Sequence, residues 1–262
     1  VIVVLASSSN VVFERSQGSE VLLSVESNQG NPDYSYQVNK KQLRLEEKGR
    51  NWGKQGWVRF KFKVPDGLEA QITTGSGNIT LQNVQLSMKS NNGSGDINII
   101  NSKGIINANV GSGNIEVEGS EGKLRLSCGS GNIVLENTAG KLSASVGSGN
   151  IRGRELKITQ ASSFSSGSGN VQVALGASPQ ANFSANSGSG NASLTLNGHS
   201  LPGELEMRAN KNNGKILSPF TFDLETEETS GSNTVLKKTK SFGDQDITVR
   251  VATGSGTAKV SE

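Results

Sequence analysis

Few residues of this chain could carry out acid–base, nucleophilic or metal chemistry. The 262 residues include one cysteine, Cys128, and one histidine, His199. One histidine cannot by itself build a catalytic triad or a His-based metal site, and one cysteine cannot form a disulfide within the chain. Cys128 shares an apolar column of the sequence with Val110 and Val146, which predicts a small buried thiol. His199 lies in a polar, turn-like stretch and is expected at the surface.

Polysaccharide cleavage would require clustered carboxylates. The aspartates are few and scattered, at Asp33, Asp66, Asp96, Asp223, Asp244 and Asp246. Glu116, Glu118 and Glu136 are about one repeat length apart, so neighbouring coils could bring them together. We favour exposed glutamates on a polar face as the explanation of this pattern, and we therefore predict no catalytic residues and no enzyme activity. A polysaccharide-cleaving enzyme is the least favoured alternative.

A short glycine-rich motif, Gly-Ser-Gly-Asn or a close variant, is the most regular feature of the chain. It begins at Gly75, Gly93, Gly111, Gly129, Gly147, Gly167 and Gly188 and, as Gly-Ser-Gly-Thr, at Gly254. No lysine follows these glycines and no helix is expected after them, so they do not predict a phosphate-binding loop. A calcium ladder needs several carboxylates, whereas this column holds a carboxylate only at Asp96. We expect neither a metal nor a cofactor.

A basic segment rich in aromatic residues lies between residues 40 and 63. It holds nine Lys or Arg against two Glu, a net charge of +7, whereas the whole chain carries +3. Trp and Tyr can stack on sugar faces, and Lys and Arg can bind carboxylate or phosphate. The candidate ligand-binding residues are Tyr34, Tyr36, Arg50, Trp52, Lys54, Trp57 and Arg59. The alternative is a twisted cap whose aromatic residues cover the end of the fold and whose lysines prevent pairing of its edge.

Composition and motif spacing indicate the elements that must carry these residues. Glycine accounts for 33 of 262 residues, well above the usual rate of roughly 7%, whereas aromatic residues make up only 5%. The motifs recur at intervals of 18 residues four times, then at 20, 21 and 66. Such a period is typical of stacked repeats with a thin core. The nearly balanced charge does not favour nucleic acid as a partner.

Each motif is followed by an alternation of apolar and polar residues, as in Ile79-Thr80-Leu81 and Ile97-Asn98-Ile99. A second alternation ends each coil, so two short strands are predicted per 18 residues. One coil cannot bury its apolar face alone, but stacked coils can. The sequence therefore predicts an all-β protein, a single-stranded β-solenoid, or parallel β-helix, with about 18 residues per coil.

The polar residue that closes each motif forms a column of its own. We expect these side chains to bond along one edge of the stack as a structural tip ladder. Its members are Asn78, Asp96, Asn114, Asn132, Asn150, Asn170 and Asn191.

Both ends of the sequence depart from the repeat. Residues 1–66 lack the motif and are expected to form an N-terminal, β-rich capping part, in which Val1–Ala6 is the first strand. Residues 67–262 are expected to form the repeat solenoid, with an irregular insertion at about 217–253, and the whole to be one continuous domain. No apolar run approaches the roughly 20 residues of a membrane-spanning helix.

These motifs resemble the bacterial putative-adhesin domain family. The resemblance rests on the run Val58–Gly67 leading into Gly75-Ser76-Gly77-Asn78-Ile79, on the repeated tips, on Asn213-Gly214-Lys215-Ile216 and on the closing Ile247–Gly256. It extends from about residue 11 to the end, and departs from the family in its regular coil spacing and at Thr257, where Asn or Asp is usual. The family resembles the head domains of some auto-transporter adhesins. The resemblance implies a β-solenoid of the cell envelope and transfers no catalytic residues.

The function that we expect is that of a non-enzymatic adhesion or interaction module outside the cytoplasm, on the cell surface, in the periplasm or secreted. Its partner would be a glycan, an anionic envelope polymer or a surface protein. The alternative is an envelope scaffold or stress-response domain that self-assembles through a solenoid end or binds a peptide.

Overall fold

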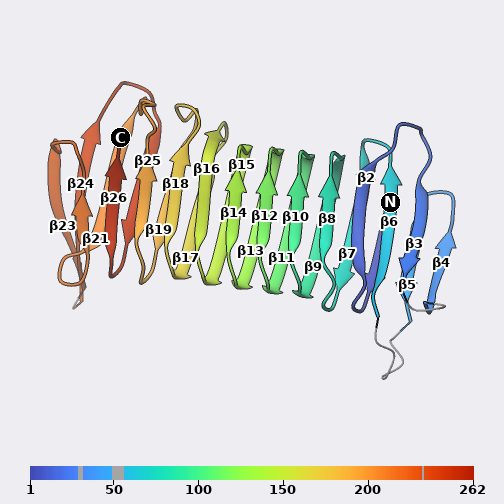
Figure 1. Cartoon of the computed structure of the whole chain (residues 1–262). Helices are drawn as coiled ribbons and strands as arrows, with labels where there is room; N and C mark the ends of the chain where they lie inside the picture. Colours follow the sequence, from blue (N-terminus) through green and yellow to red (C-terminus); the bar gives the residue numbers. More distant parts are fainter. Residues whose placement is uncertain (29–31, 49–55, 232) are drawn as a thin grey trace. The chain divides into compact units, whose positions relative to one another are not determined.

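The computed structural model describes residues 1–28, 32–48, 56–231 and 233–262. The chain divides into two compact units, Val1–Cys128 and Gly129–Glu262. The described residues form strands joined by turns and contain no helix, so none long and apolar enough to cross a membrane. The predicted all-β solenoid is confirmed in each unit (Figure 1).

Thirteen strands begin in the N-terminal unit, and the boundary between the two units falls within the last of them. They are β1 (Ile2–Ala6), β2 (Asn10–Arg15), β3 (Leu22–Ser27), β4 (Tyr34–Val38), β5 (Leu43–Glu47), β6 (Val58–Val64), β7 (Leu68–Thr74), β8 (Ile79–Gln82), β9 (Gln85–Ser94), β10 (Ile97–Ile100), β11 (Lys103–Ser112), β12 (Ile115–Glu118) and β13 (Glu121–Ser130). The first of these lies within Val1–Ala6, as predicted.

Two sheets face each other in this unit. Sheet A has the order β4-β5-β1-β7-β9-β11, and sheet B has the order β3-β6-β2-β8-β10-β12. All of these pairs are parallel except β4 with β5 and β3 with β6. The pair β1–β2 therefore forms a coil that lies between the coil β5–β6 and the coil β7–β8.

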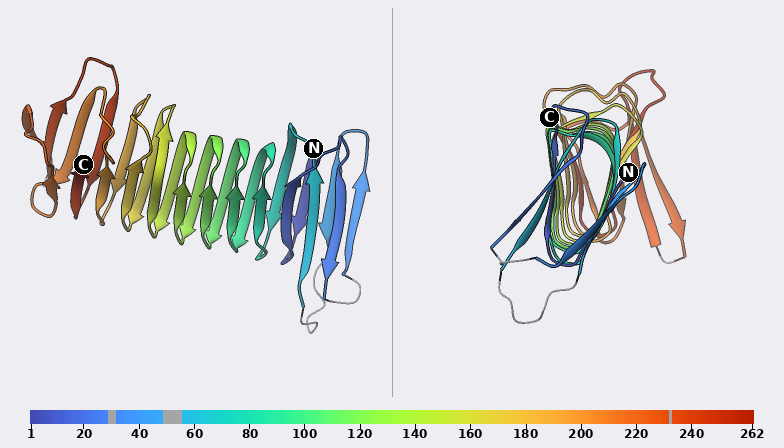
Figure 2. Two further views of the ribbon diagram at one scale, coloured as in Figure 1. Left: turned by 45° about the horizontal axis from the view of Figure 1, so that its top comes forward. Right: turned by 90° about the vertical axis from the view of Figure 1, so that its right-hand side faces the viewer.

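In the C-terminal unit the remaining strands follow the same plan. They are β14 (Ile133–Glu136), β15 (Ala139–Ser148), β16 (Ile151–Ile158), β17 (Ser162–Ser168), β18 (Val171–Leu175), β19 (Phe183–Ser187), β20 (Ala192–Thr195), β21 (Glu204–Asn210), β22 (Lys215–Leu217), β23 (Leu224–Ser230), β24 (Asn233–Ser241), β25 (Thr248–Thr253) and β26 (Thr257–Ser261). Figure 2 shows these strands in yellow-green to red.

The last coil of the chain lies inside the C-terminal unit's stack and not at its end. Sheet A runs β15-β17-β19-β25-β21-β24-β23, and sheet B runs β14-β16-β18-β20-β26-β22. The coil β25–β26 thus separates the coil β19–β20 from the coil β21–β22. Only the hairpin β23–β24 is antiparallel to its neighbours.

The core consists of apolar ladders along the stack, as the alternation predicts. Ile79, Ile97 and Ile115 pair in register and are fully buried. The tips approach one another so closely that side chains are excluded. A Cβ on Gly113, whose φ is +149°, would overlap the carbonyl oxygen of Gly95 on the preceding coil. Glycine satisfies both the backbone conformation and the close approach.

Candidate functional site

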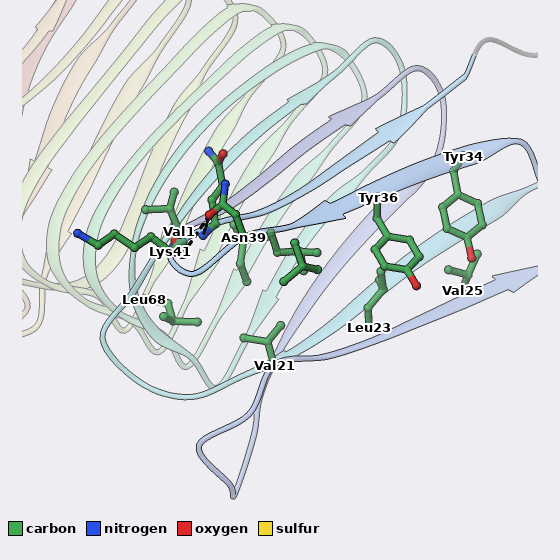
Figure 3. Close-up of a pocket in the computed structure, with 13 residues that line it drawn as sticks. Val1, Val21, Leu23, Val25, Tyr34, Tyr36, Asn39, Lys41 and Leu68 are labelled. Atoms are coloured by element: carbon green, nitrogen blue, oxygen red, sulfur yellow. Dashed lines mark hydrogen bonds between the residues drawn. The ribbon is translucent and has the colours of Figure 1, made fainter.

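A pocket of about 660 Å³ lies in the N-terminal unit between β3 and β4, each the outermost strand of its sheet (Figure 3). Eight aliphatic side chains and two tyrosines line most of it; the polar lining residues are Asn39, Lys41 and Gln42. Figure 3 shows Leu23 and Val25 of β3 facing Tyr36 and Tyr34 of β4 across the pocket. Its volume and apolar lining are typical of a binding pocket.

Alternation along the two strands explains why the pocket is apolar. In β3 the side chains of Leu23 and Val25 point inward, and in β4 those of Tyr34, Tyr36 and Val38 do so. They remain accessible because no further coil of the described chain covers them. Tyr36 is 60% exposed and Val38 is 69% exposed, in contrast to Phe60 on the adjoining strand β6, which is fully buried.

The backbone of β4 presents an unpaired edge beside the pocket. The Lys48 N–H donates to the Asp33 carbonyl, and the Asn39 N–H donates to the Gln42 carbonyl. Antiparallel bonding alternates along a strand, so the odd-numbered residues of β4 bond to β5. The peptide groups of the even-numbered residues, Tyr34 to Val38, point toward the open edge, where no described strand pairs with them.

The edge of β3 has the same arrangement. The Asn28 N–H donates to the Trp57 carbonyl, and this bond places the even-numbered residues of β3 in contact with β6. The peptide groups of Leu23 and Val25 therefore point outward, with no pairing strand in the described part of the chain. The pocket thus lies between two open strand edges, and the residues that bear its side chains also present the unpaired backbone.

The predicted ligand-binding residues do not form one site. Tyr34 and Tyr36 line the pocket, and the Tyr34 ring packs edge-on against Phe60 at 5.5 Å between centroids. Trp57 immediately precedes β6, and Arg59 lies on the outward face of that strand, where its guanidinium is 5.4 Å from the Trp57 ring centroid. Arg50, Trp52 and Lys54 lie outside the described residues.

Carboxylates offset much of the positive charge expected on that outward face. Arg59 pairs with Glu26 at 3.1 Å, and Lys61 pairs with Glu14 at 2.8 Å. Arg15 also pairs with Asp66. Of the described basic residues on the outward face of β6, Arg59 and Lys61 are therefore paired with carboxylates.

The polar tip column forms a hydrogen-bonded ladder within each unit. In the N-terminal unit the Asp96 N–H donates to Asn78 Oδ1, and the Asn114 N–H donates to Asp96 Oδ1. In the C-terminal unit Asn132, Asn150, Asn170 and Asn191 are linked in the same way. Each bond satisfies a backbone amide at a turn, which is a structural role.

Sequence reasoning missed residues that extend these ladders and residues that cap them. Asn10 accepts from the Asn78 N–H, and Thr257 donates its N–H to Asn191. The Glu47 Oε2 atom accepts from the backbone amides of Ser7, Ser8 and Ser9 at 2.6–3.3 Å. Thr257 closes the last copy of the motif, Gly254-Ser255-Gly256-Thr257, whereas no repeat marks Asn10, the first residue of β2, or Glu47.

Ion pairing concentrates in the C-terminal unit around Glu206 of β21. Its side chain, 5% exposed, contacts Arg208 on the same strand, Arg250 on β25 and Lys237 on β24. Burial alone raises the pKa of Glu206, but the hydrogen bonds from Arg250, Arg208 and Lys237 outweigh it, so its pKa is lowered. This network joins three neighbouring strands.

The remaining shifted carboxyl groups are also ionised partners of lysines. A hydrogen bond from Lys103 lowers the pKa of Glu121, and a hydrogen bond from Lys240 lowers that of Asp223. A general acid requires a raised pKa, and none of these carboxyls has one. Over the described residues, no three His, Cys, Asp or Glu side chains gather where they could hold a metal ion.

The individual residues considered for chemistry have structural contacts. Cys128 is buried and lies 3.0 Å from the Gly113 carbonyl oxygen. Glu136 pairs with Arg154. His199 is half-buried and follows a turn, and its backbone N–H donates to the Leu196 carbonyl.

The model of the Toastrack DUF4097 family matches residues 1–214. The chain belongs to this family. Membership agrees with the predicted resemblance to putative-adhesin domains. Among solved structures, this Toastrack chain is similar to a putative cell adhesion protein from Clostridium sporogenes, with 12% identity, a TM-score of 0.29, and coverage of 99% of this chain and 91% of the other. No curated protein matches the sequence.

Proposed function

We propose that this Toastrack protein is a non-enzymatic interaction module that binds an extended protein segment at the N-terminal end of its coil stack. The observation that carries the proposal is the pocket between two open strand edges, β3 and β4. Natural proteins rarely leave such edges uncovered, because unpaired backbone groups recruit other strands.

The geometry suits recognition by strand addition. In this mode backbone hydrogen bonds supply affinity, and pockets for alternate side chains supply specificity. A strand added to β4 would pair with the peptide groups of Tyr34, Tyr36 and Val38. Alternate side chains of that strand would enter the pocket, whose lining is apolar. The favoured segment is therefore extended and alternates apolar with polar residues.

Glycans and anionic polymers fit the observed surfaces less well. The pocket contains one cationic side chain, Lys41, and the basic residues beside Trp57 are paired with carboxylates. Of the partners expected from the sequence, a surface protein is the one that two open strand edges favour. The proposed location, outside the cytoplasm at the bacterial envelope, rests on the resemblance to adhesin domains.

The test is a binding screen of the full chain against extended peptides, with envelope glycans and anionic polymers in parallel. We expect peptides with alternating apolar residues to bind, and Tyr36→Lys to weaken binding at least tenfold because a charge would enter the apolar pocket. Arg59→Ala, on the outward face, is the matched control and should bind normally. Selective glycan binding that Arg59→Ala abolishes and Tyr36→Lys leaves unchanged would contradict the proposal.

A further inference from the structure

The two open edges at the N-terminal end pose a requirement that one bound peptide does not meet. β4 belongs to sheet A and β3 to sheet B, and the pocket separates them. A single added strand would pair with one edge and leave the other exposed. A partner that satisfies both must present two strands, one for each sheet.

We propose that this partner is a second copy of the chain, joined end to end about a two-fold axis perpendicular to the two sheets. The inference rests on the proposed function, because it names the strand donor for the same site. Such an axis reverses strand direction, so β4 would meet β4 of the other copy in antiparallel orientation, and β3 would meet β3. Two-fold interfaces of this self-complementary kind are the commonest in homo-oligomers.

The register follows from which peptide groups are available. Tyr34, Tyr36 and Val38 present backbone groups toward the edge of β4. If Tyr36 lies on the two-fold axis, it pairs with Tyr36 of the second copy, and Tyr34 pairs with Val38. In the other sheet, the same axis would set β3 opposite β3 of the second copy in antiparallel orientation. The outward-pointing peptide groups of Tyr34, Tyr36 and Val38 then gain partners.

Side-chain chemistry supports the same register. The inward side chains of the two copies would meet and join their pockets into one apolar core, covering Tyr36 and Val38, which are 60% and 69% exposed in the single chain. Burial of apolar surface is the main driving force of such association.

The flanking charges are also self-complementary. Asp33 precedes β4 and Lys40 follows it, and both are exposed. Neither makes an ion pair with another side chain in the described part of the molecule. Antiparallel pairing about Tyr36 would set Asp33 opposite Asn39 of the second copy, beside Lys40. Each interface would then contain this attraction twice, which favours the antiparallel register.

The first experiment measures the mass of the full chain by light scattering and sedimentation across a wide concentration range. We expect a reversible dimer. Asp33→Lys should weaken it roughly tenfold, since two attractions become repulsions. The double variant Asp33→Lys with Lys40→Asp should restore it. A chain that stays monomeric at every concentration would overturn the inference; the proposed function would still stand if peptides bind to that monomer.

The second experiment fixes the register by cross-linking in a Cys128→Ala background. Residues opposite each other in a hydrogen-bonded antiparallel pair have Cα atoms about 5.5 Å apart, within reach of a disulfide. Tyr36→Cys should therefore form a disulfide-linked dimer under mild oxidation. Gln37→Cys, its neighbour on the outward face, should not. Equal cross-linking of both variants, or of neither, would overturn the proposed register.

Discussion

The first coils of the N-terminal unit and the last coils of the C-terminal unit share a topology. They differ in the covering strands, by which we mean the antiparallel strands at the sheet edges: β3 and β4 in the first, and the hairpin β23–β24 in the second. In the first, the coil β1–β2 lies between β5–β6 and β7–β8; in the second, the coil β25–β26 lies between β19–β20 and β21–β22. In both, the terminal coil of the described chain has a paired coil on either side. This arrangement protects each terminal coil from fraying.

The covering strands create different surfaces. β3 and β4 each cover one sheet of the N-terminal unit and leave apolar residues accessible between them. In the C-terminal unit the hairpin β23–β24 covers sheet A, and all seven residues of β23 are exposed. Four acidic side chains of this hairpin region pair with cations, at Asp223, Glu225, Glu227 and Glu228. Thus one topology supports both an accessible apolar surface and a charged, ion-paired surface.

Substitution of the tip glycines should destabilise the shared topology in both units. These variants should have the largest effect on stability of those proposed for the comparison. A Cβ on Gly77 would overlap the Ser9 carbonyl oxygen, and one on Gly256 would overlap that of Gly190. Gly77→Ala and Gly256→Ala should each lower the free energy of unfolding by about 3 kcal/mol, because backbone must shift. Denaturant unfolding measures this.

The controls are glycines in open space. Gly67 and Gly198 have φ of +83° and +76°, and a Cβ on either would meet nothing within 4 Å. Their replacement by alanine should cost only about 1 kcal/mol, from backbone conformation alone. If all four variants lose similar stability, close packing of the terminal coils is not what the tip glycines provide.

The two regions also differ in how deeply their ion-paired carboxylates are buried. Glu206→Gln leaves Arg208, Lys237 and Arg250 without their shared carboxylate and should cost about 3 kcal/mol. The exposed Arg59–Glu26 pair of the N-terminal unit, tested by Glu26→Gln, should cost less than about 1 kcal/mol. Thermal and denaturant unfolding compare the two. Equal losses would show that the buried network does not hold β25 in place.

The same network predicts a pH dependence. Because the pKa of Glu206 is lower in the folded chain than its ordinary value of 4.5, the unfolded state binds more protons in acid. The stabilising contribution is complete above that value and is lost as the pH falls through the lower folded-state pKa. The stability difference between wild type and Glu206→Gln should therefore shrink in acid. A difference that grew as the pH fell would contradict this assignment.

At the pocket, binding and stability should separate. Tyr36→Ser removes an exposed ring and should change the free energy of unfolding by less than about 1 kcal/mol, while it weakens dimerisation. Phe60→Ala, at a buried neighbour, should cost about 3–5 kcal/mol. Calorimetry and light scattering on both variants check this. A large loss of stability in Tyr36→Ser would make the residue a part of the core.

The smallest expected change in stability concerns the acidic edge strand. Replacing Glu225, Glu227 and Glu228 of β23 by serine should change the free energy of unfolding by no more than about 1 kcal/mol, because the pairs are exposed. The variant should nevertheless associate more readily, since charge protects edge strands. If light scattering shows no added association, the acidic side chains are not what keeps this edge unpaired.

Residue spacing predicted the coils and the tip column because close approach and strand alternation act locally. The 18-residue interval aligns Asn78 with Asp96 and Asn114, and their hydrogen bonds follow from that alignment. Thr257, which closes the Gly-Ser-Gly-Thr copy of the motif, extends the column by donating its N–H to Asn191. Asn10 extends it without the motif, and the pairing of β2 with β8 reveals it.

The 18-residue period of the motifs could not predict the order in which the outer coils stack. Strand pairing between distant segments, such as β1 with β5 and β7, depends on which edges remain available after the chain has folded back. The candidate site shows the same limit. The alternation in β6 could have placed Arg59 outward, but the separation of Tyr34 and Tyr36 from Trp57 arises because β4 belongs to sheet A and β6 to sheet B.

Amide hydrogen exchange at low and high protein concentration tests the central claim most directly. The account predicts that Tyr36 and Val38 of β4, together with Leu23 and Val25 of β3, gain protection as concentration rises. The amides of β23 should exchange equally fast at both concentrations. Concentration-dependent protection at β23, with none at β3 and β4, would contradict the claim that the N-terminal end is the binding end.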